Sequence, residues 1–391
     1  MGKEGKRVGW LRRLLAVIIG LVFIFSGILK IMDPVGTGLI VSEHLKFLHL
    51  WFMRGAAPVF GVLLALVEAS LGAALVTGVY RKTVAITTLS LLGLFTLLTA
   101  LLLIRNPEMG CGCFGEAVNM THLQSFLKNI ILLVLSVGAF VPFSLFGDSP
   151  RRRYVAFWIL VPLFAIALLY SYSHLPPMDF TTMAPGTEIC SESAETAMPE
   201  AEFIYSKDGI EERFTLDDLP DSSWTFVRVG DFDNFEGAGA SVPVRSASLE
   251  DADTLLTTGK VIVFPVHRPS SANWNRILRG CVRAGAAGAR PVVLVASTPE
   301  EIDSMDVPLE LPLYYSDYKP LITLCRANGG AVLLSDGYIV AKWAPSDLPG
   351  EEKLKAFIEG DPVEMSSARG IHTRLVAEGF AIAVLAILIF V

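Results

Sequence analysis

The chain has 391 residues, of which 52% are hydrophobic and only 18% charged, and its mean hydropathy is +0.52. This composition is too apolar for a soluble protein and too charged for one that lies wholly in lipid, so it predicts a membrane protein with one soluble domain. The net charge of −7 is modest and basic residues cluster beside apolar runs, which argues against any nucleic-acid partner.

The first apolar run, residues 14–31, follows a basic N-terminal segment and is about as long as a bilayer-spanning helix. It is too long for the apolar part of a secretory signal, and no small-residue cleavage site follows it, so we expect an uncleaved first helix. Further apolar runs predict five more spans. They cover residues 59–80, 84–104, 126–146, 155–170 and 375–391.

Basic residues orient these spans. They lie at the N-terminus, at Arg81–Lys82 and at residues 151–153. If each apolar run crosses the membrane once, all three clusters lie on the same side, and an excess of basic residues marks that side as cytoplasmic. The opposite side then receives an expected loop at 33–58, the turn at residues 111–113, and residues 173–374. We therefore expect a multi-pass protein of a bacterial inner (cytoplasmic) membrane, with its soluble domain in the periplasm, where disulfides persist.

Two of the five cysteines, Cys111 and Cys113, are separated only by Gly112, which supplies the backbone freedom that so small a ring would need. A disulfide across one intervening residue departs from relaxed geometry, and strained disulfides are more oxidising and labile. The sequence thus predicts Cys111 and Cys113 as catalytic redox residues. The alternative is two unrelated loop cysteines.

Glu68 lies near the middle of the second predicted span, where an ionisable group is costly and usually faces the bundle interior. One interpretation is a proton relay or a polar anchor for a bound cofactor. The other is a protonated carboxyl that hydrogen-bonds a hydroxyl such as Ser26 or Thr99 and holds helices together.

Four other polar residues near the predicted spans receive simpler interpretations. Lys30 and Lys128 are expected to extend from helix ends toward lipid headgroups. His44 and His49 are expected at the surface. No metal ligands are predicted.

Residues 174–201 are rich in Pro, Ser, Thr, Ala and Glu and predict a linker, in which Cys190 is a candidate shuttle thiol. The following segment predicts alternating strands and helices. The expected elements are a hairpin over 203–216, strands at 261–264, 291–295 and 313–315, helices at 272–287 and 320–327, a hairpin over 332–341, and a helix at 350–359.

This order resembles a thioredoxin-like domain. Thioredoxins carry Cys-X-X-Cys after the first central strand, but here residues 267–274 contain no cysteine. We therefore expect a degenerate thioredoxin-like module that binds or scaffolds and has no thiol–disulfide activity of its own. Cys281 and Cys325 fall inside predicted helices, where cysteine usually behaves as a small buried hydrophobe.

Several segments of the apolar half resemble the DoxX/MauE family of redox-associated membrane proteins. They are Phe25-Ser26-Gly27-Ile28-Leu29-Lys30-Ile31-Met32-Asp33-Pro34, Glu68 with Gly72, Phe95-Thr96-Leu97-Leu98-Thr99, and Cys111-Gly112-Cys113-Phe114-Gly115-Glu116 followed by Phe126-Leu127-Lys128-Asn129. The resemblance covers about residues 10–146. It implies a four-helix bundle related in architecture to vitamin K epoxide reductase and DsbB-type disulfide generators. In the methylamine-utilisation branch it implies maturation of a disulfide-rich periplasmic dehydrogenase subunit.

Together these inferences divide the chain. A four-helix transmembrane domain occupies residues 1–146 and a fifth helix 147–173. The linker covers 174–201, the periplasmic thioredoxin-like α/β domain 202–370, and a C-terminal transmembrane helix 371–391.

Two functions remain open. In the first, the chain is a membrane thiol–disulfide oxidoreductase whose Cys111 and Cys113 exchange with a periplasmic, cysteine-containing client and pass electrons to a membrane carrier. The candidate carrier is a quinone. In the second, it is a non-catalytic scaffold with structural cysteines, whose soluble domain recruits a partner. The bundle lacks the second cysteine pair of a DsbB-like relay, which weighs against the first.

Overall fold

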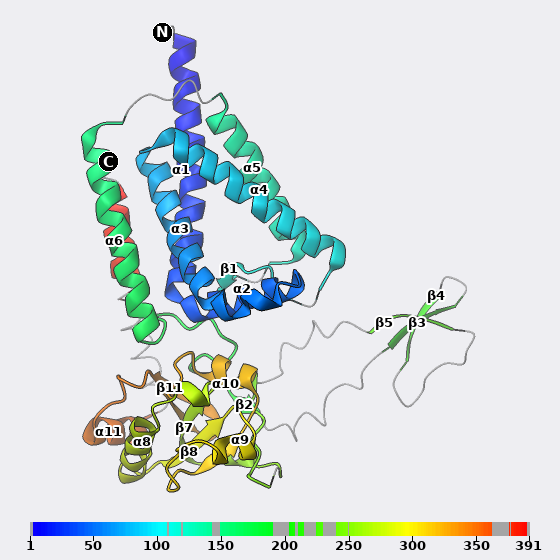
Figure 1. Cartoon of the computed structure of the whole chain (residues 1–391), viewed down its shortest axis with the longest axis vertical. Coiled ribbons are helices and arrows are strands. Elements are labelled where there is room, and N and C mark those ends of the chain that lie inside the picture. The colour runs from blue at the N-terminus through cyan, green and yellow to red at the C-terminus, as the bar shows by residue number, and fades with distance from the viewer. Residues whose placement is uncertain are drawn as a thin grey trace. The chain divides into compact units, whose positions relative to one another are not determined.

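The protein is described here by a computed structural model (Figure 1). It describes residues 3–107, 109–118, 120–142, 149–190, 203–207, 210–214, 224–229, 240–248, 250–361, 375 and 377–388. The chain divides into two compact units. The bundle unit comprises Met1–Thr181 with Ser367–Val391, and the sheet unit comprises Thr182–Ser366.

Within the described residues, the bundle unit has five helices long and apolar enough to cross a membrane. They are α1 (Lys3–Met32), α3 (Ala57–Thr77), α4 (Arg81–Arg105), α5 (His122–Phe140) and α6 (Arg151–Ser173). These helices confirm a multi-pass α-helical membrane protein. Of the sixth predicted span, the described residues form a short apolar helix over Ala377–Leu388.

The fourth predicted span ends earlier than its apolar run. It was expected to reach residue 146, but α5 ends at Phe140, and Val141 is extended. Proline follows at residue 142, and the residue before a proline is pushed out of the helical conformation.

Glycines bring α1 and α3 into close contact. A Cβ atom on Gly27 would lie 2.5 Å from the backbone nitrogen of Ala69, and one on Gly72 would lie 2.6 Å from the carbonyl oxygen of Gly20. Small residues at a helix interface allow such an approach within a membrane. The contact brings the polar residues of α1 opposite Glu68 of α3.

Basic residues gather at one end of the bundle. The Arg12 guanidinium donates to the Ala139 carbonyl at the end of α5 (2.8 Å), and that of Arg13 donates to the Leu75 carbonyl near the end of α3 (2.8 Å). The charge of Arg13 also interacts with those of Arg81 and Arg153. The three basic clusters of the sequence therefore meet at the end where α1 begins.

The opposite end is closed by α2 (Pro34–Phe47), the 3-10 helix η1 (Trp51–Ala56) and β1 (Cys113–Glu116) (Figure 1). The expected loop at 33–58 between the first two spans therefore contains an α-helix and a 3-10 helix. Asp33 caps α2 by accepting the Gly36 amide at 2.8 Å, and Pro34 occupies the first helical turn, where its missing N–H costs no hydrogen bond.

The sheet unit contains a mixed five-stranded sheet in the order β11-β10-β7-β8-β9. Three neighbouring strands are parallel to one another: β7 (Lys260–Val266), β8 (Arg290–Val295) and β9 (Leu313–Tyr315). On the other side of β7, β10 (Ala331–Ser335) pairs antiparallel with both β7 and β11 (Tyr338–Trp343). The helices are α7 (Thr254–Thr257), α8 (Trp274–Ala286), α9 (Pro299–Asp303), α10 (Tyr318–Leu324) and α11 (Glu351–Glu359). The strands agree with those predicted from the sequence.

Apolar side chains of the sheet form the core of this unit. Ile262 and Phe264 of β7 and Val293 and Val295 of β8 are buried in one cluster with Ile277 of α8. Burial of both β7 and β8 accounts for their continuous apolar sequences, which are typical of parallel strands covered on both faces.

Two smaller sheets complete the sheet unit. One joins β4 (Ile210–Phe214), β3 (Phe203–Lys207) and β5 (Thr225–Val229), and it contains the predicted hairpin. The other pairs β2 (Ile189–Cys190) with β6 (Ala240–Ser241). Within the predicted linker, the Ile189 amide donates to the Gly337 carbonyl at 2.8 Å, so this part of the chain is tied to the turn between β10 and β11.

Candidate redox site

The Cys-Gly-Cys turn lies at the bundle end that α2 closes. Cys111 is 8% exposed, and the described side chains do not include that of Cys113. Gly112 has φ +63°, and an added Cβ would collide with the Ile40 side chain of α2. Both the backbone conformation and the close approach to Ile40 favour glycine at this position.

A histidine that the sequence analysis did not single out contacts Cys111. The Cys111 Sγ lies 2.9 Å from Nδ1 of His122, the first residue of α5. The other ring nitrogen, Nε2, lies 3.0 Å from the Pro107 carbonyl oxygen. The backbone of the turn and the start of α5 thus hold the imidazole between them.

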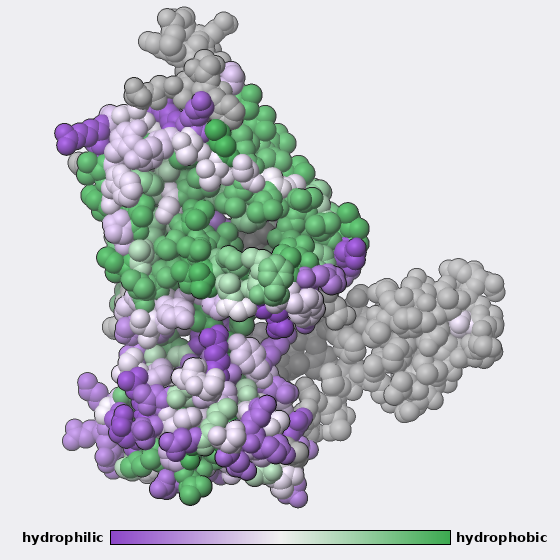
Figure 2. Space-filling view, viewed as in Figure 1, coloured by the Kyte–Doolittle hydropathy of each residue, from purple (hydrophilic) through white to green (hydrophobic). Residues whose placement is uncertain are grey.

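Cys111 also lines a cavity of about 400 Å³ inside the bundle. A volume of this size is typical of sites for small organic ligands, and its walls are mostly apolar. Leu63 and Val67 of α3 and Leu94 of α4 line the cavity and are themselves 51%, 44% and 59% exposed. The cavity therefore opens through apolar side chains between α3 and α4, and Figure 2 shows a hollow in the apolar face of the bundle.

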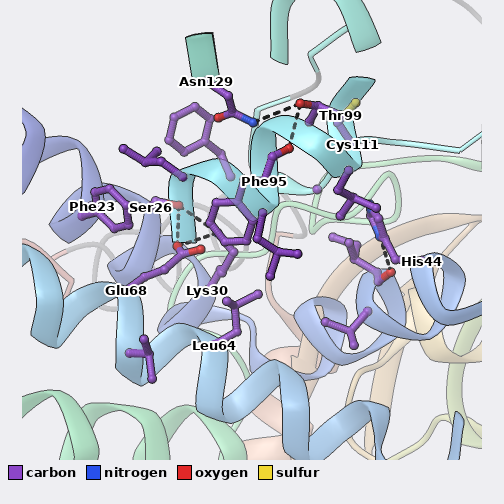
Figure 3. Close-up of a pocket in the computed structure, with 18 of the residues that line it drawn as sticks. Phe23, Ser26, Lys30, His44, Leu64, Glu68, Phe95, Thr99, Cys111 and Asn129 are labelled. Atoms are coloured by element: carbon purple, nitrogen blue, oxygen red, sulfur yellow. Dashed lines mark hydrogen bonds and ion pairs between the residues drawn. The ribbon is translucent and has the colours of Figure 1, made fainter. Parts of the chain in front are cut away.

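A buried polar cluster forms one wall of this cavity (Figure 3). The Lys30 ammonium lies 2.8 Å from Glu68 Oε2, and the Ser26 hydroxyl donates to the same oxygen at 2.7 Å. Lys30 is 3% exposed and Glu68 2%. Ser26 is one of the two hydroxyls suggested as partners of a protonated Glu68, but the carboxyl also pairs with the Lys30 ammonium. The expectation that Lys30 extends toward headgroups was wrong, because its side chain is buried beside Glu68.

A second polar group lies on another wall. The Asn129 side-chain amide of α5 donates to the Thr99 hydroxyl of α4 at 3.3 Å, and Thr99 donates to the Phe95 carbonyl at 2.8 Å (Figure 3). Asn129 is buried. Thr99 was one of the two hydroxyls suggested for Glu68, but in the structure it accepts from Asn129 of α5 and donates to carbonyls of its own helix.

Two further expectations for cavity residues were wrong. His44 is buried and lines the cavity, with its Nδ1 2.7 Å from the Ile40 carbonyl oxygen. Burial lowers its pKa. Lys128 also lines the cavity, with Nζ 4.5 Å from the centre of the Phe114 ring, a cation–π contact that holds it inward. His49 is exposed, as predicted.

In the sheet unit, a buried histidine follows β7 directly. His267 is 4% exposed, and its ring packs edge-on against Tyr318 with centroids 5.8 Å apart. Burial, with the charge of Arg268, lowers its pKa to about 4. It therefore stays neutral at pH 7.

The two described cysteine side chains of the sheet unit, Cys281 and Cys325, are both buried. Cys281, in α8, carries a buried free thiol whose pKa burial raises to about 12, so it is inert at neutral pH. Cys325 is buried just after α10, rather than inside the helix predicted at 320–327. The side chain of Cys190 lies outside the described residues. Among the described residues, no group of three or more His, Cys, Asp or Glu could hold a metal ion.

Comparison with known proteins finds a partial match to a curated protein. The curated protein "Protein TlpB" of Flavobacterium psychrophilum is 28% identical over 169 residues, which are 42% of this chain and 46% of that protein. The chain thus spans about half the length of this curated relative. No solved structure matches the chain.

Two family descriptions match parts of the chain. Residues 199–231 match a domain of unknown function (DUF8463), and this range contains β3, β4 and β5. Residues 8–142 match "Methylamine utilisation protein MauE". This range covers α1 from its second turn onward, α2 to α5, the Cys-Gly-Cys turn and the residues that line the cavity. Residues 8–142 of this membrane protein therefore form a domain of the MauE family.

Proposed function

We propose that this protein is a membrane thiol–disulfide oxidoreductase that assists disulfide formation in periplasmic client proteins. Cys111 and Cys113 take electrons from client cysteines and pass them to a carrier in the bundle cavity. The observation that carries this proposal is the position of Cys111, whose side chain lines an apolar cavity between membrane-spanning helices. A cysteine that only formed a structural disulfide in a loop would not need to line such a cavity.

The arrangement of charge supports a periplasmic position for the turn. Arg12 and Arg13 lie at the end of the bundle opposite α2 and β1, and cytoplasmic ends of membrane helices are enriched in such residues. In a bacterial inner membrane the Cys-Gly-Cys end then faces the periplasm, where disulfides persist. In the same topology, the sheet unit follows the periplasmic end of α6.

The cavity fits a quinone as the carrier. A quinone is an apolar ring with two carbonyl oxygens, so it suits apolar walls and an opening toward lipid between α3 and α4. The N–H groups of Lys30 and Asn129, on different walls, suit its carbonyl oxygens. When bound, a quinone supplies the capacity to accept two electrons and two protons.

Separate cysteine variants test this function in cells. We expect both Cys111→Ser and Cys113→Ser to abolish client oxidation, and one of them to accumulate a client adduct, because a mixed disulfide persists when the resolving thiol is absent. Non-reducing gels and thiol trapping measure both outcomes. The inert, buried Cys281 gives the matched control, since Cys281→Ser should leave both readouts unchanged.

The alternative function gives the opposite result. If neither variant traps a client and both oxidise clients at the wild-type level, the cysteine pair is structural. The scaffold interpretation would then hold.

For the sheet unit we propose a thioredoxin-like binding module without redox activity. The parallel strands β7 and β8 next to the antiparallel β10–β11 hairpin support such a fold. The position after β7 holds His267 and a short 3-10 turn over Pro269–Ser271, which contains no thiol. This module would bring a client or partner to the membrane domain.

A further inference from the structure

The geometry around Cys111 determines which nitrogen of His122 carries the proton. The Pro107 carbonyl oxygen can only accept a hydrogen bond, so Nε2 of His122, 3.0 Å away, must donate its N–H. In the neutral ring, Nδ1 then has a lone pair. That lone pair faces the Cys111 sulfur at 2.9 Å, where it can accept the thiol proton.

The start of α5 fixes the imidazole in this position. Thr121 caps the helix in a reciprocal capping box with Gln124, so His122 is held at the first helical position. The positive end of the helix dipole also lies there and favours a thiolate nearby. His44 of α2 interacts electrostatically with His122, and the other charged groups lining the cavity are Lys30, Glu68 and Lys128.

We infer that His122 is a catalytic residue of this site, which takes and returns the proton of Cys111, and that Cys111 is the cysteine facing the carrier. The inference rests on the proposed function for its reaction, but the contact itself does not. Because Cys111 is buried on the cavity wall, Cys113 is the cysteine that a client meets.

The exchange step follows from this assignment. A client thiolate attacks the sulfur of Cys113 in the Cys111–Cys113 disulfide; a client–Cys113 bond forms and the Cys111–Cys113 bond breaks. The electron pair leaves on Cys111, which takes a proton from His122; His122 has this proton because the first client thiol released it on forming the thiolate. The second client thiol then displaces Cys113 and its proton passes to the Cys113 sulfur, so the client loses two electrons and two protons and the pair gains them.

The return step uses the same histidine in the other direction. His122 accepts the Cys111 proton, and the Cys111–Cys113 disulfide forms again. Two electrons and two protons leave to the oxidant, a membrane carrier of the quinone class. His122 thus serves both half-reactions without a net change in its own protonation.

Thiol alkylation of the full-length protein tests the role of His122 without client or carrier. In a Cys113→Ser background in lipid nanodiscs, the iodoacetamide alkylation rate of Cys111 is measured from pH 5 to pH 10 by mass spectrometry. With His122 present, we expect the half-maximal rate well below the pH of about 8.5 typical of an ordinary thiol. His122→Gln can still donate to Pro107 but has no imidazole, and should slow alkylation at pH 7 about tenfold, equivalent to one pH unit.

The controls separate a chemical role from a structural one. His122→Ala should shift the pH profile like His122→Gln, whereas a loosened turn would raise the Cys111 alkylation rate at every pH. His49→Asn is the matched histidine control, because His49 is exposed with φ 59°, a conformation that asparagine tolerates, and its profile should not move.

An unchanged profile in His122→Gln would overturn this inference, even if client oxidation still required both cysteines. The opposite outcome is also informative. If His122→Gln shifts the pH profile but clients are oxidised normally in Cys111→Ser, the Cys111–His122 pair holds and the proposed function is overturned.

Discussion

A carboxylate in the middle of a membrane helix needs a partner, and Glu68 accepts hydrogen bonds from both Lys30 and Ser26. Two charges buried together cost less than one, but their desolvation leaves little net stability. The location on the cavity wall adds a reason for keeping the pair, namely a polar surface for a ligand.

Single and double substitutions separate these two roles. Glu68→Leu should destabilise the bundle by about 3–5 kcal/mol, because the Lys30 charge is left buried without its carboxylate. The double variant Lys30→Met with Glu68→Leu should recover most of this stability, and thermal unfolding in nanodiscs measures both. If the pair anchors a ligand, the double variant folds but does not oxidise clients.

A matched control for this pair is Thr88→Val. The Thr88 hydroxyl is buried and donates to the Val84 carbonyl of its own helix, outside the cavity lining, so its loss should change stability little. Full client oxidation by the Lys30–Glu68 double variant would assign the pair a structural role only.

His267 makes the stability of the sheet unit depend on pH. Its pKa is about 4 in the folded chain and ordinarily 6.5, so between these values the unfolded state binds more protons. Keeping His267 neutral therefore contributes roughly 3 kcal/mol to the free energy of unfolding of the sheet unit. This contribution is fully present above pH 6.5 and is lost as the pH falls toward 4. Faster hydrogen exchange of β7 amides at pH 5 than at pH 7, after correction for intrinsic rates, would measure it.

The control is His267→Phe, which keeps an aromatic ring against Tyr318 but cannot take a proton. It should remove the pH dependence of exchange in β7. If exchange in this variant retains the same slope between pH 4 and pH 6.5, other groups are responsible.

At the scale of elements, α2 decides the shape of the site. Its Ile40 side chain packs against Gly112, and its His44 lines the cavity, so this helix sets both the position of the turn and one end of the chamber. Its glycines have low helix propensity, so the sequence alone does not indicate a helix here. Their role is tertiary, because a Cβ on Gly61 of α3 would lie 2.8 Å from the Gly38 nitrogen.

Two glycines of the same turn give a matched test of this packing. Gly112→Ala should be destabilising by about 2 kcal/mol or more, because it combines backbone strain at φ +63° with a collision against Ile40. Gly110→Ala meets nothing within 4 Å and should be nearly neutral. Thermal unfolding and Cys111 alkylation compare the two variants, and equal effects would show that the contact with α2 does not position the turn.

At the scale of the whole molecule, charge should determine orientation. Reporter fusions after Gly115 and Ser241 should both give periplasmic signals, because arginines gather at the opposite end of the bundle. A cytoplasmic signal after Gly115 would place the cysteine pair in a reducing compartment and contradict the redox function with it. A fusion after Arg81 is the control and should report from the cytoplasm.

By itself, the sequence determined the membrane-spanning helices, the central strands of the sheet unit and the glycine between two cysteines. These features follow from local properties: the length of an apolar run, strand periodicity and the backbone freedom of one residue. The helix α2 was not predicted from the sequence. Asp33 and Pro34 are good helix-start signals, but the glycines that follow weaken a local helix prediction.

Only the tertiary structure decided the site itself. The Glu68–Lys30 contact joins residues 38 positions apart, and its existence depends on how closely α1 and α3 pack and which faces they turn to each other. The contact between Cys111 and His122 spans 11 positions and depends on where the turn returns to the start of α5. Pairings of this kind arise from helix packing and loop geometry, which neither composition nor periodicity encodes. The cavity and the contact of Cys111 with His122 were therefore visible only in the folded chain.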